Sequence, residues 1–179
     1  ASLASRRQLD DAAHDADPLG TRFLAQARAT LRAARQARDD AAEAEAARRR
    51  ALAALAARDH FRARQHFECA KRLRPNSPTG TTLTGLGIAC FAEGDVDAAI
   101  SAYRAALAAA PKRVDAHVNL GHALCHARRY DEALVELREA TRLRPRHAIA
   151  HWRLGEALRA SCAPAAALES LTIAAELAP

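Results

Sequence analysis

The side chains with the clearest capacity for metal chemistry lie in one short segment around His122 and His126. On a helix these two imidazoles would stand one turn apart, a spacing that can hold a zinc ion, and Cys125 is adjacent. Cys125 would point about 100° away from His126, and Asp115 is two turns from His122, so this face lacks a third ligand. We therefore predict no metal and no cofactor. We interpret the two histidines as solvated side chains whose protonation, near an unperturbed pKa of about 6.5, makes binding sensitive to pH.

No arrangement typical of catalysis is found in the sequence. It contains no nucleophile with a base and an orienting group, no glycine-rich phosphate loop and no paired carboxylates on an apolar floor. Asp131 and Glu132 are adjacent, but they begin a predicted helix, where the positive end of the helix dipole favours acidic side chains. We predict that the chain is not an enzyme in its own right.

A basic patch of Arg48, Arg49 and Arg50 is the main candidate for contact with nucleic acid. Glu43 and Glu45 lie close by, and Glu45 can pair with Arg49 at i, i+4. A short arginine cluster without interleaved aromatic residues is more typical of an exposed charged helix face. Binding of nucleic acid through the N-terminal arm is therefore kept only as an alternative.

The elements that position these side chains follow from an internal repeat of 34 residues. Pro111, Pro145 and Pro179 mark its end, and the residues ahead of each proline recur in register. A period of this size is typical of stacked helical repeats, which bury their apolar faces on one another. The recurring positions are Leu86, Leu120 and Leu154; Gly87, Gly121 and Gly155; Ala99, Ala133 and Ala167; and Ala106, Ala140 and Ala174.

The repeat resembles the tetratricopeptide repeat, whose pattern is W-x2-L-G-x2-Y…A-x3-F…P. The first copy reads Leu83-x2-Leu86-Gly87-x2-Cys90, then Ala99-x3-Tyr103. A degenerate copy upstream keeps Ala63-x3-Phe67, Ala70 and Pro75 but lacks the Leu-Gly pair. The resemblance implies an all-α fold, a right-handed superhelical solenoid of antiparallel helix pairs with three full repeats, one degenerate repeat and N-terminal helices. The other two copies read His117-x2-Leu120-Gly121-x2-Leu124 with Ala133-x3-Leu137, and His151-x2-Leu154-Gly155-x2-Leu158 with Ala167-x3-Leu171.

We predict five segments along the chain. Residues 1–43 form a basic N-terminal helical arm or cap, and 44–79 form the degenerate repeat with a longer connecting turn. Residues 80–113, 114–147 and 148–179 form the three full repeats. In the arm we expect a helix ending before Pro18, another from about 22 to 38, and an alanine-rich solvated helix that can continue to Ala57. The apolar face of the second of these helices holds Phe23, Leu24, Ala27, Leu31 and Ala34.

Local signals set the expected helix packing and helix ends. The repeated glycines indicate close approach of two helices, since each costs a helix interior about 1 kcal/mol relative to alanine. Gly94-Asp95 predicts a helix stop followed by a cap, and Pro164 suits the first turn of a helix. His117 and His151 are predicted to pack between helices. The repeat-end prolines should stop the second helices near Arg74, Ala110, Arg144 and Ala178.

In arrays that this one resembles, the first helix of each repeat lines a concave groove. Opposite the packing residues, the first full repeat presents the stripe Thr81, Gly85, Ile88 and Ala92. We predict that a protein segment binds along this groove, and Trp152 is either a packing residue or the anchor of the bound segment. The predicted partner-binding residues are Thr84, Ile88, Asp115, Asn119, His122, His126, Trp152, Arg153 and Glu156.

One known use of such grooves is not expected here. Certain tetratricopeptide co-chaperones grip a C-terminal carboxylate with Lys, Asn, Asn, Lys and Arg on three first helices. Asn119 and Arg153 match two of those places, whereas Thr84, Ile88 and Ile149 occupy the other three. A carboxylate clamp of that kind is therefore not predicted.

Composition and charge restrict the remaining classes of function. The net charge is +6, and the excess lies in residues 1–75, which carry 16 basic and 10 acidic side chains. No apolar run approaches the ~20 residues needed to span a membrane. The four cysteines show no CxxC spacing, so we expect free thiols and an intracellular, most simply cytoplasmic, protein, with an organelle as the alternative.

The predicted function is that of a non-catalytic scaffold or adaptor subunit, because stacked repeats form an extended surface for a partner protein. Two alternatives stay open. The chain could be the repeat region of a larger enzyme that recruits its protein substrate. It could also be an RNA-associated module that uses the Arg-rich N-terminal helix.

Overall fold

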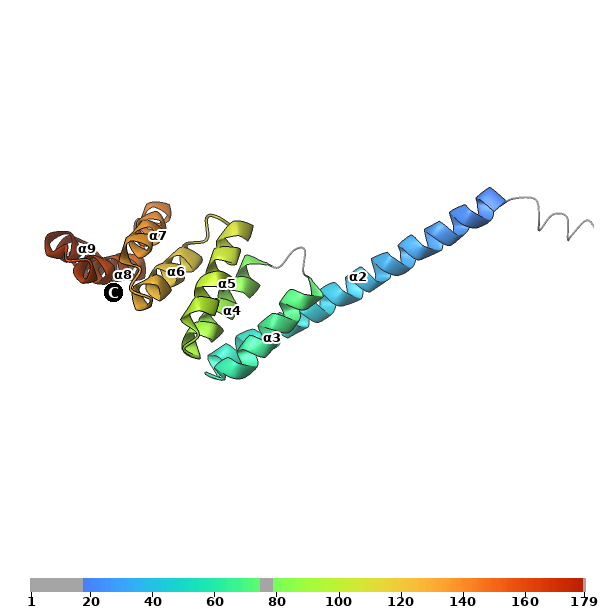
Figure 1. The fold of residues 1–179 in the computed structure, drawn as a ribbon, viewed down its shortest axis with the longest axis horizontal. Helices are drawn as coiled ribbons and strands as arrows, with labels where there is room; N and C mark the ends of the chain where they lie inside the picture. The colour runs from blue at the N-terminus through green and yellow to red at the C-terminus, as the bar shows by residue number, and fades with distance from the viewer. Residues whose placement is uncertain (1–17, 75–78, 179) are drawn as a thin grey trace, which may run out of the picture. The chain divides into compact units, whose positions relative to one another are not determined.

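The chain folds into helices, as seen in a computed structural model that describes residues 18–74 and 79–178. No strand occurs in those residues (Figure 1). The contacts divide the chain into two units, with the division between Ala42 and Glu43. The helices are α2 (Pro18–Ala56), α3 (His60–Leu73), α4 (Gly80–Ala92), α5 (Val96–Ala109), α6 (Val114–His126), α7 (Tyr130–Leu143), α8 (Ala148–Ala160) and α9 (Pro164–Leu177).

The last six helices reproduce the sequence period in their boundaries. The first helices α4, α6 and α8 begin at Gly80, Val114 and Ala148, and each second helix, α5, α7 and α9, starts sixteen residues after its partner. The turn inside each pair places one residue in the left-handed region: Gly94 with φ 86°, Arg128 with φ 58° and Cys162 with φ 61°. Only the first of these is glycine, so the turn geometry is imposed by the repeat.

The repeated glycines bring the two helices of each pair together, as the sequence predicted. A Cβ placed on Gly121 would lie 2.5 Å from Cγ of Leu137, and one on Gly155 would lie 2.6 Å from Cγ of Leu171. The ring of Tyr103 occupies the same place against Gly87. Each glycine therefore faces the large residue of the A-x3-F position. This contact is the core of each repeat, and Leu120, Leu124 and Leu137 are among its fully buried side chains.

The helix ends also match their local signals. The side chain of Asp95 accepts a hydrogen bond from the backbone N–H of Ala98 and caps α5. Pro164 lies in the first turn of α9. The second helices end at the C-cap residues Arg74, Ala110, Arg144 and Ala178, which the prolines predicted.

The two packing histidines make the same hydrogen bond in successive repeats. Nε2 of His117 lies 2.9 Å from the carbonyl oxygen of Pro111, and Nε2 of His151 lies 2.9 Å from that of Pro145. His117 is buried and its Nδ1 also lies 2.7 Å from the carboxylate of Glu136. Each histidine thus ties the first helix of its repeat to the proline that ends the preceding one.

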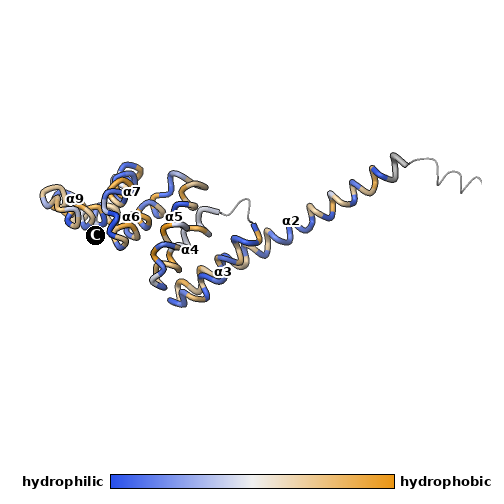
Figure 2. Tube along the Cα trace, viewed as in Figure 1, coloured by the Kyte–Doolittle hydropathy of each residue, from blue (hydrophilic) through white to orange (hydrophobic). Residues whose placement is uncertain are grey.

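The N-terminal region is one helix where the sequence suggested two. α2 runs unbroken from Pro18 to Ala56, and polar and apolar residues alternate along it (Figure 2). Its C-terminal part belongs to the array, because Ala44, Ala47 and Ala51 are buried and Ala51 shares a core with Phe67 of α3. The helix expected before Pro18 and most of the longer turn predicted after Pro75 lie outside the described residues.

Candidate functional site

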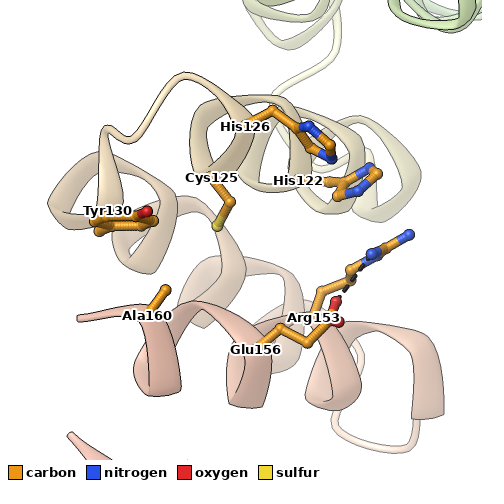
Figure 3. A pocket seen from close by; sticks show the side chains of 7 residues that line it. All are labelled: His122, Cys125, His126, Tyr130, Arg153, Glu156 and Ala160. Carbon is orange, nitrogen blue, oxygen red and sulfur yellow. Dashed lines mark hydrogen bonds and ion pairs between the residues drawn. The ribbon is translucent and has the colours of Figure 1, made fainter. Parts of the chain in front are cut away.

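The largest gathering of predicted binding residues lies between the first helices α6 and α8, which contact each other directly. His122, Cys125 and His126 from α6 face Arg153, Glu156 and Ala160 from α8, and Tyr130 at the start of α7 closes one end (Figure 3). These seven residues line a hollow of about 240 Å³. We call this hollow the α6–α8 pocket.

His122 is half-buried in an aromatic cluster, which corrects the prediction of a solvated histidine. Its ring centroid lies 4.8 Å from that of Phe91 on α4 and 4.8 Å from that of His126. Burial first, and then the positive charges of Arg153 and the neighbouring His126, lower the pKa of His122 to about 4. The predicted pH sensitivity near 6.5 is therefore wrong for His122, which is neutral at pH 7.

Arg153 holds the other wall of the pocket through two contacts on its own helix. Its Nη1 donates to the carboxylate of Glu156 at 2.9 Å, and its guanidinium carbon lies 4.2 Å from the centroid of the Trp152 ring. These contacts fix the direction of the guanidinium while leaving further N–H donors of the group for a ligand. The pKa of Cys125 is raised, first by burial and then by the negative charge of Glu156.

Two of the positions assigned to the groove in the first full repeat are instead buried. Thr84 is only 4% exposed, and its hydroxyl donates to the carbonyl oxygen of Gly80 at 2.8 Å. Its counterpart 34 residues later, Val118, belongs to a core cluster with Ala150 of the next repeat, so this position faces the following repeat. Gly85 is covered by the ring of Phe67 from α3. The structure therefore corrects two predictions, because Thr84 is not available to bind a partner and Gly85 does not lie on the groove surface.

The other predicted residues lie outside the α6–α8 pocket. Ile88 is 37% exposed and Asn119 is partly exposed, whereas Asp115 is exposed and pairs with Arg113. Trp152 is 43% exposed and contributes to a second hollow of about 340 Å³. That apolar hollow is lined by Ala148, Ile149, Trp152, Leu171, Ala174, Ala175 and Ala178.

The arginine patch is partly neutralised within its own helix. Arg48 donates two hydrogen bonds to Glu45, the shorter at 2.6 Å, and Arg49 lies 3.5 Å from the same carboxylate. The expected pair between Glu45 and Arg49 is thus present. Of the three arginines, Arg48 is the least exposed, with 27% of its side chain accessible.

Sequence reasoning missed two residues of the pocket, Cys125 and Tyr130. Cys125 points away from the two histidine rings, as expected, and toward α8, where it lines the same hollow. Tyr130 follows the turn that joins α6 to α7. Among the residues that the structure describes, no three His, Cys, Asp or Glu side chains could together hold a metal ion.

The fold and the pocket define a class of protein built from stacked helix pairs. Three models of the tetratricopeptide repeat match residues 42–112, 91–142 and 120–179, and together they span 42–179. The chain belongs to the tetratricopeptide repeat family. Comparison with curated protein sequences found no match.

Solved structures of the same architecture resemble this chain. MamA from Desulfovibrio magneticus RS-1 is 24% identical with a TM-score of 0.69, and the likeness covers 75% of each chain. YrrB, described as a TPR protein with an unusual peptide-binding site, is 22% identical with a TM-score of 0.64, covering 72% of this chain and 66% of YrrB. PilF from Pseudomonas aeruginosa is 23% identical with a TM-score of 0.68, covering 78% of this chain and 63% of its own. At these identities the likeness establishes the fold.

Within residues 18–74 and 79–178, no helix combines the length and the apolar character needed to cross a bilayer.

Proposed function

We propose that this chain is a non-catalytic adaptor that binds an extended segment of a partner protein along its first helices, centred on the α6–α8 pocket. The observation that supports this most is the meeting of His122 and His126 with Arg153 and Glu156 across two repeats. The two histidines lie on α6, and Arg153 and Glu156 lie about 30 residues later on α8. Buried contacts between these helices hold the four side chains in place. A rigid array with such a surface suits capture of a flexible chain.

The chemistry of the pocket favours a segment that presents both backbone polar groups and an apolar side chain. Arg153 can donate to peptide carbonyl oxygens, and the carboxylate of Glu156 can accept from peptide N–H groups. The neutral ring of His122 against Phe91 gives one apolar wall. Trp152, stacked under Arg153 and still 43% exposed, would supply area at the edge of the bound segment.

Peptide display tests this proposal without knowledge of the natural partner. Random peptides would be selected on the whole chain, and the affinity of the selected peptides would be measured by fluorescence anisotropy. We expect Arg153→Ala and Trp152→Ala each to weaken binding about tenfold or more, since aromatic and arginine anchors carry most interface energy. Both side chains are partly exposed, so the melting curve should change little.

Val135→Ala provides the matched control. Val135 is 64% exposed on α7, a second helix, and it lies outside the pocket. Its loss should leave peptide affinity unchanged. Equal affinity of all three variants and the wild type, or a failure to select any peptide, would exclude the α6–α8 pocket as a peptide site.

The cellular setting of this function is part of the same proposal. Cys69, Cys90, Cys125 and Cys162 are all free thiols, and Cys162 is the one among them that is exposed. Free thiols are typical of a reducing compartment such as the cytoplasm.

The proposed boundaries of the four repeats are 44–79, 80–113, 114–147 and 148–179.

A further inference from the structure

The arm of α2 that precedes Glu43 carries an apolar stripe that none of the described residues of its own unit covers. Phe23 is 75% exposed, Leu24 is 56% exposed and Leu31 is 61% exposed. Phe23 and Leu31 are eight residues apart, with Ala27 between them, so they line one side of the helix with Leu24 beside them. Large apolar groups gathered on one exposed helix face mark a surface that binds something.

The charged side chains of residues 22–38 on this helix are all basic. From Arg22 to Arg38 there are five arginines and neither Asp nor Glu. Arg28 and Arg32 continue the row that begins at Leu24, each at a spacing of four residues, and Arg35 follows Leu31 at the same spacing. Three guanidinium groups therefore border the apolar stripe. The other side of the helix consists mainly of small or neutral residues, including Ala25, Gln26, Ala29, Thr30 and Ala33.

We propose that this helix lies on an anionic phospholipid surface, with Phe23, Leu24 and Leu31 inserted among the acyl chains near the headgroups and the arginines on the phosphates. A helix with an apolar stripe, a basic border and low mean hydropathy binds in the plane of a membrane interface without crossing it. Arginine suits this position because its guanidinium group pairs with two phosphate oxygens at once and its stem can lie along apolar surface. The high alanine content keeps the helix formed before it binds.

The apolar stripe favours a lipid surface over a polynucleotide. Binding to nucleic acid depends on phosphate contacts and on aromatic side chains interleaved with the bases, and it gains nothing from Leu24 or Leu31. A membrane interface uses both features of the helix at once. This proposal concerns the arm alone and is independent of the α6–α8 pocket.

Vesicle sedimentation of the whole chain tests the proposal. The chain is mixed with vesicles of phosphatidylcholine alone and with vesicles that also contain phosphatidylserine, and the bound fraction is measured. We expect binding only to the anionic vesicles, and a fall of about fivefold for each arginine replaced in Arg28→Gln and Arg32→Gln. Equal binding to both kinds of vesicle, or binding to neither, would overturn the proposal.

Two aspartate variants separate insertion of the stripe from simple charge attraction. Leu31→Asp and Ala29→Asp add the same charge to the same helix, but only Leu31 lies on the stripe. We expect Leu31→Asp to reduce vesicle binding at least tenfold more than Ala29→Asp does, because only the first removes buried apolar area. Circular dichroism of both variants would check that their helix content is kept.

An equal loss in the two aspartate variants would show attraction without insertion and would contradict the proposal. A polynucleotide-binding assay at low salt distinguishes a lipid-binding arm from a nucleic-acid-binding arm. If the chain binds polynucleotide but not anionic vesicles, and Leu31→Asp leaves that binding unchanged, the arm is a nucleic-acid contact and the lipid proposal is wrong.

Discussion

The array from Glu43 onward and the arm before it use the same large apolar residues in opposite ways. In the array Leu124 is 1% exposed and packs in a core built from several helices, whereas Leu31 in the arm is 61% exposed. Both lie on regular helices. The difference is therefore one of packing, and it teaches that helix formation and burial are separate properties of this chain. Stability is expected to reside in the array, and the arm is expected to keep its apolar groups for a partner.

The same substitution placed in both regions gives the largest expected contrast. Leu124→Asp buries a carboxylate in an apolar core and should cost about 4 kcal/mol or more, which is enough to unfold a marginally stable array. Leu31→Asp should change the free energy of unfolding by less than about 0.5 kcal/mol. Fluorescence of Trp152, the single tryptophan, reports unfolding of the array in urea. Similar losses in both variants would contradict the division of roles.

A pair of phenylalanines on α3 sharpens the contrast within the array. Phe67 is fully buried and covers Gly85, whereas Phe61 on the same helix is 65% exposed. Phe67→Ala should lower the free energy of unfolding by about 3–5 kcal/mol through the cavity that it leaves. Phe61→Ala is the matched control and should have little effect. If Phe67→Ala melts like the wild type, the degenerate repeat is not packed on α4 as described.

Overpacking at a repeat glycine tests the contact inside one helix pair. The larger side chain introduced by Gly121→Leu would collide with Leu137. We expect this variant to lose about 1–3 kcal/mol of unfolding free energy, and Gly121→Ala to lose less. Ala105→Leu, at an exposed position of α5, controls for the change in residue type. A melting curve of Gly121→Leu identical to that of the wild type would contradict the helix pairing.

The smallest expected effect is a loss of folding stability at low pH through protonation of His122. Because the pKa of His122 falls from 6.5 to about 4 on folding, the unfolded chain binds more protons between these values. The contribution of neutral His122 to the free energy of unfolding is fully present above pH 6.5 and is lost as the pH falls toward 4. After allowance for solvent screening, its size is about 1 kcal/mol.

His122→Phe keeps a ring against Phe91 but cannot be protonated. We expect this variant to lose less stability than the wild type between pH 7 and pH 4.5, as measured by urea unfolding at each pH. An identical acid dependence in the two proteins would show that His122 is not the group that titrates in this range.

Helix positions and helix ends were predictable because their causes are local or repeat at a fixed interval. Prolines ended the second helices, Asp95 capped α5, and the recurring glycines located the close contacts. The binding surface was less predictable. His122, His126, Arg153 and Glu156 were expected on the groove side and do meet, whereas Thr84 was assigned to the groove and is buried. Its hydroxyl donates to a carbonyl oxygen of its own helix, so the polar side chain tolerates burial and its residue type alone did not reveal that it is buried.

The sequence by itself determined the family, the number of helix pairs and the residues at which they turn, because each follows from hydrophobic spacing and from the steric demands of glycine and proline. Only the tertiary structure decided which polar side chains share a pocket and in which protonation state. The ring of Phe67 over Gly85, the approach of Cys125 to Arg153 and the neutral state of His122 all depend on neighbours from other helices. Desolvation and contact between distant segments are properties of the packed array, and no local pattern of residues encodes them.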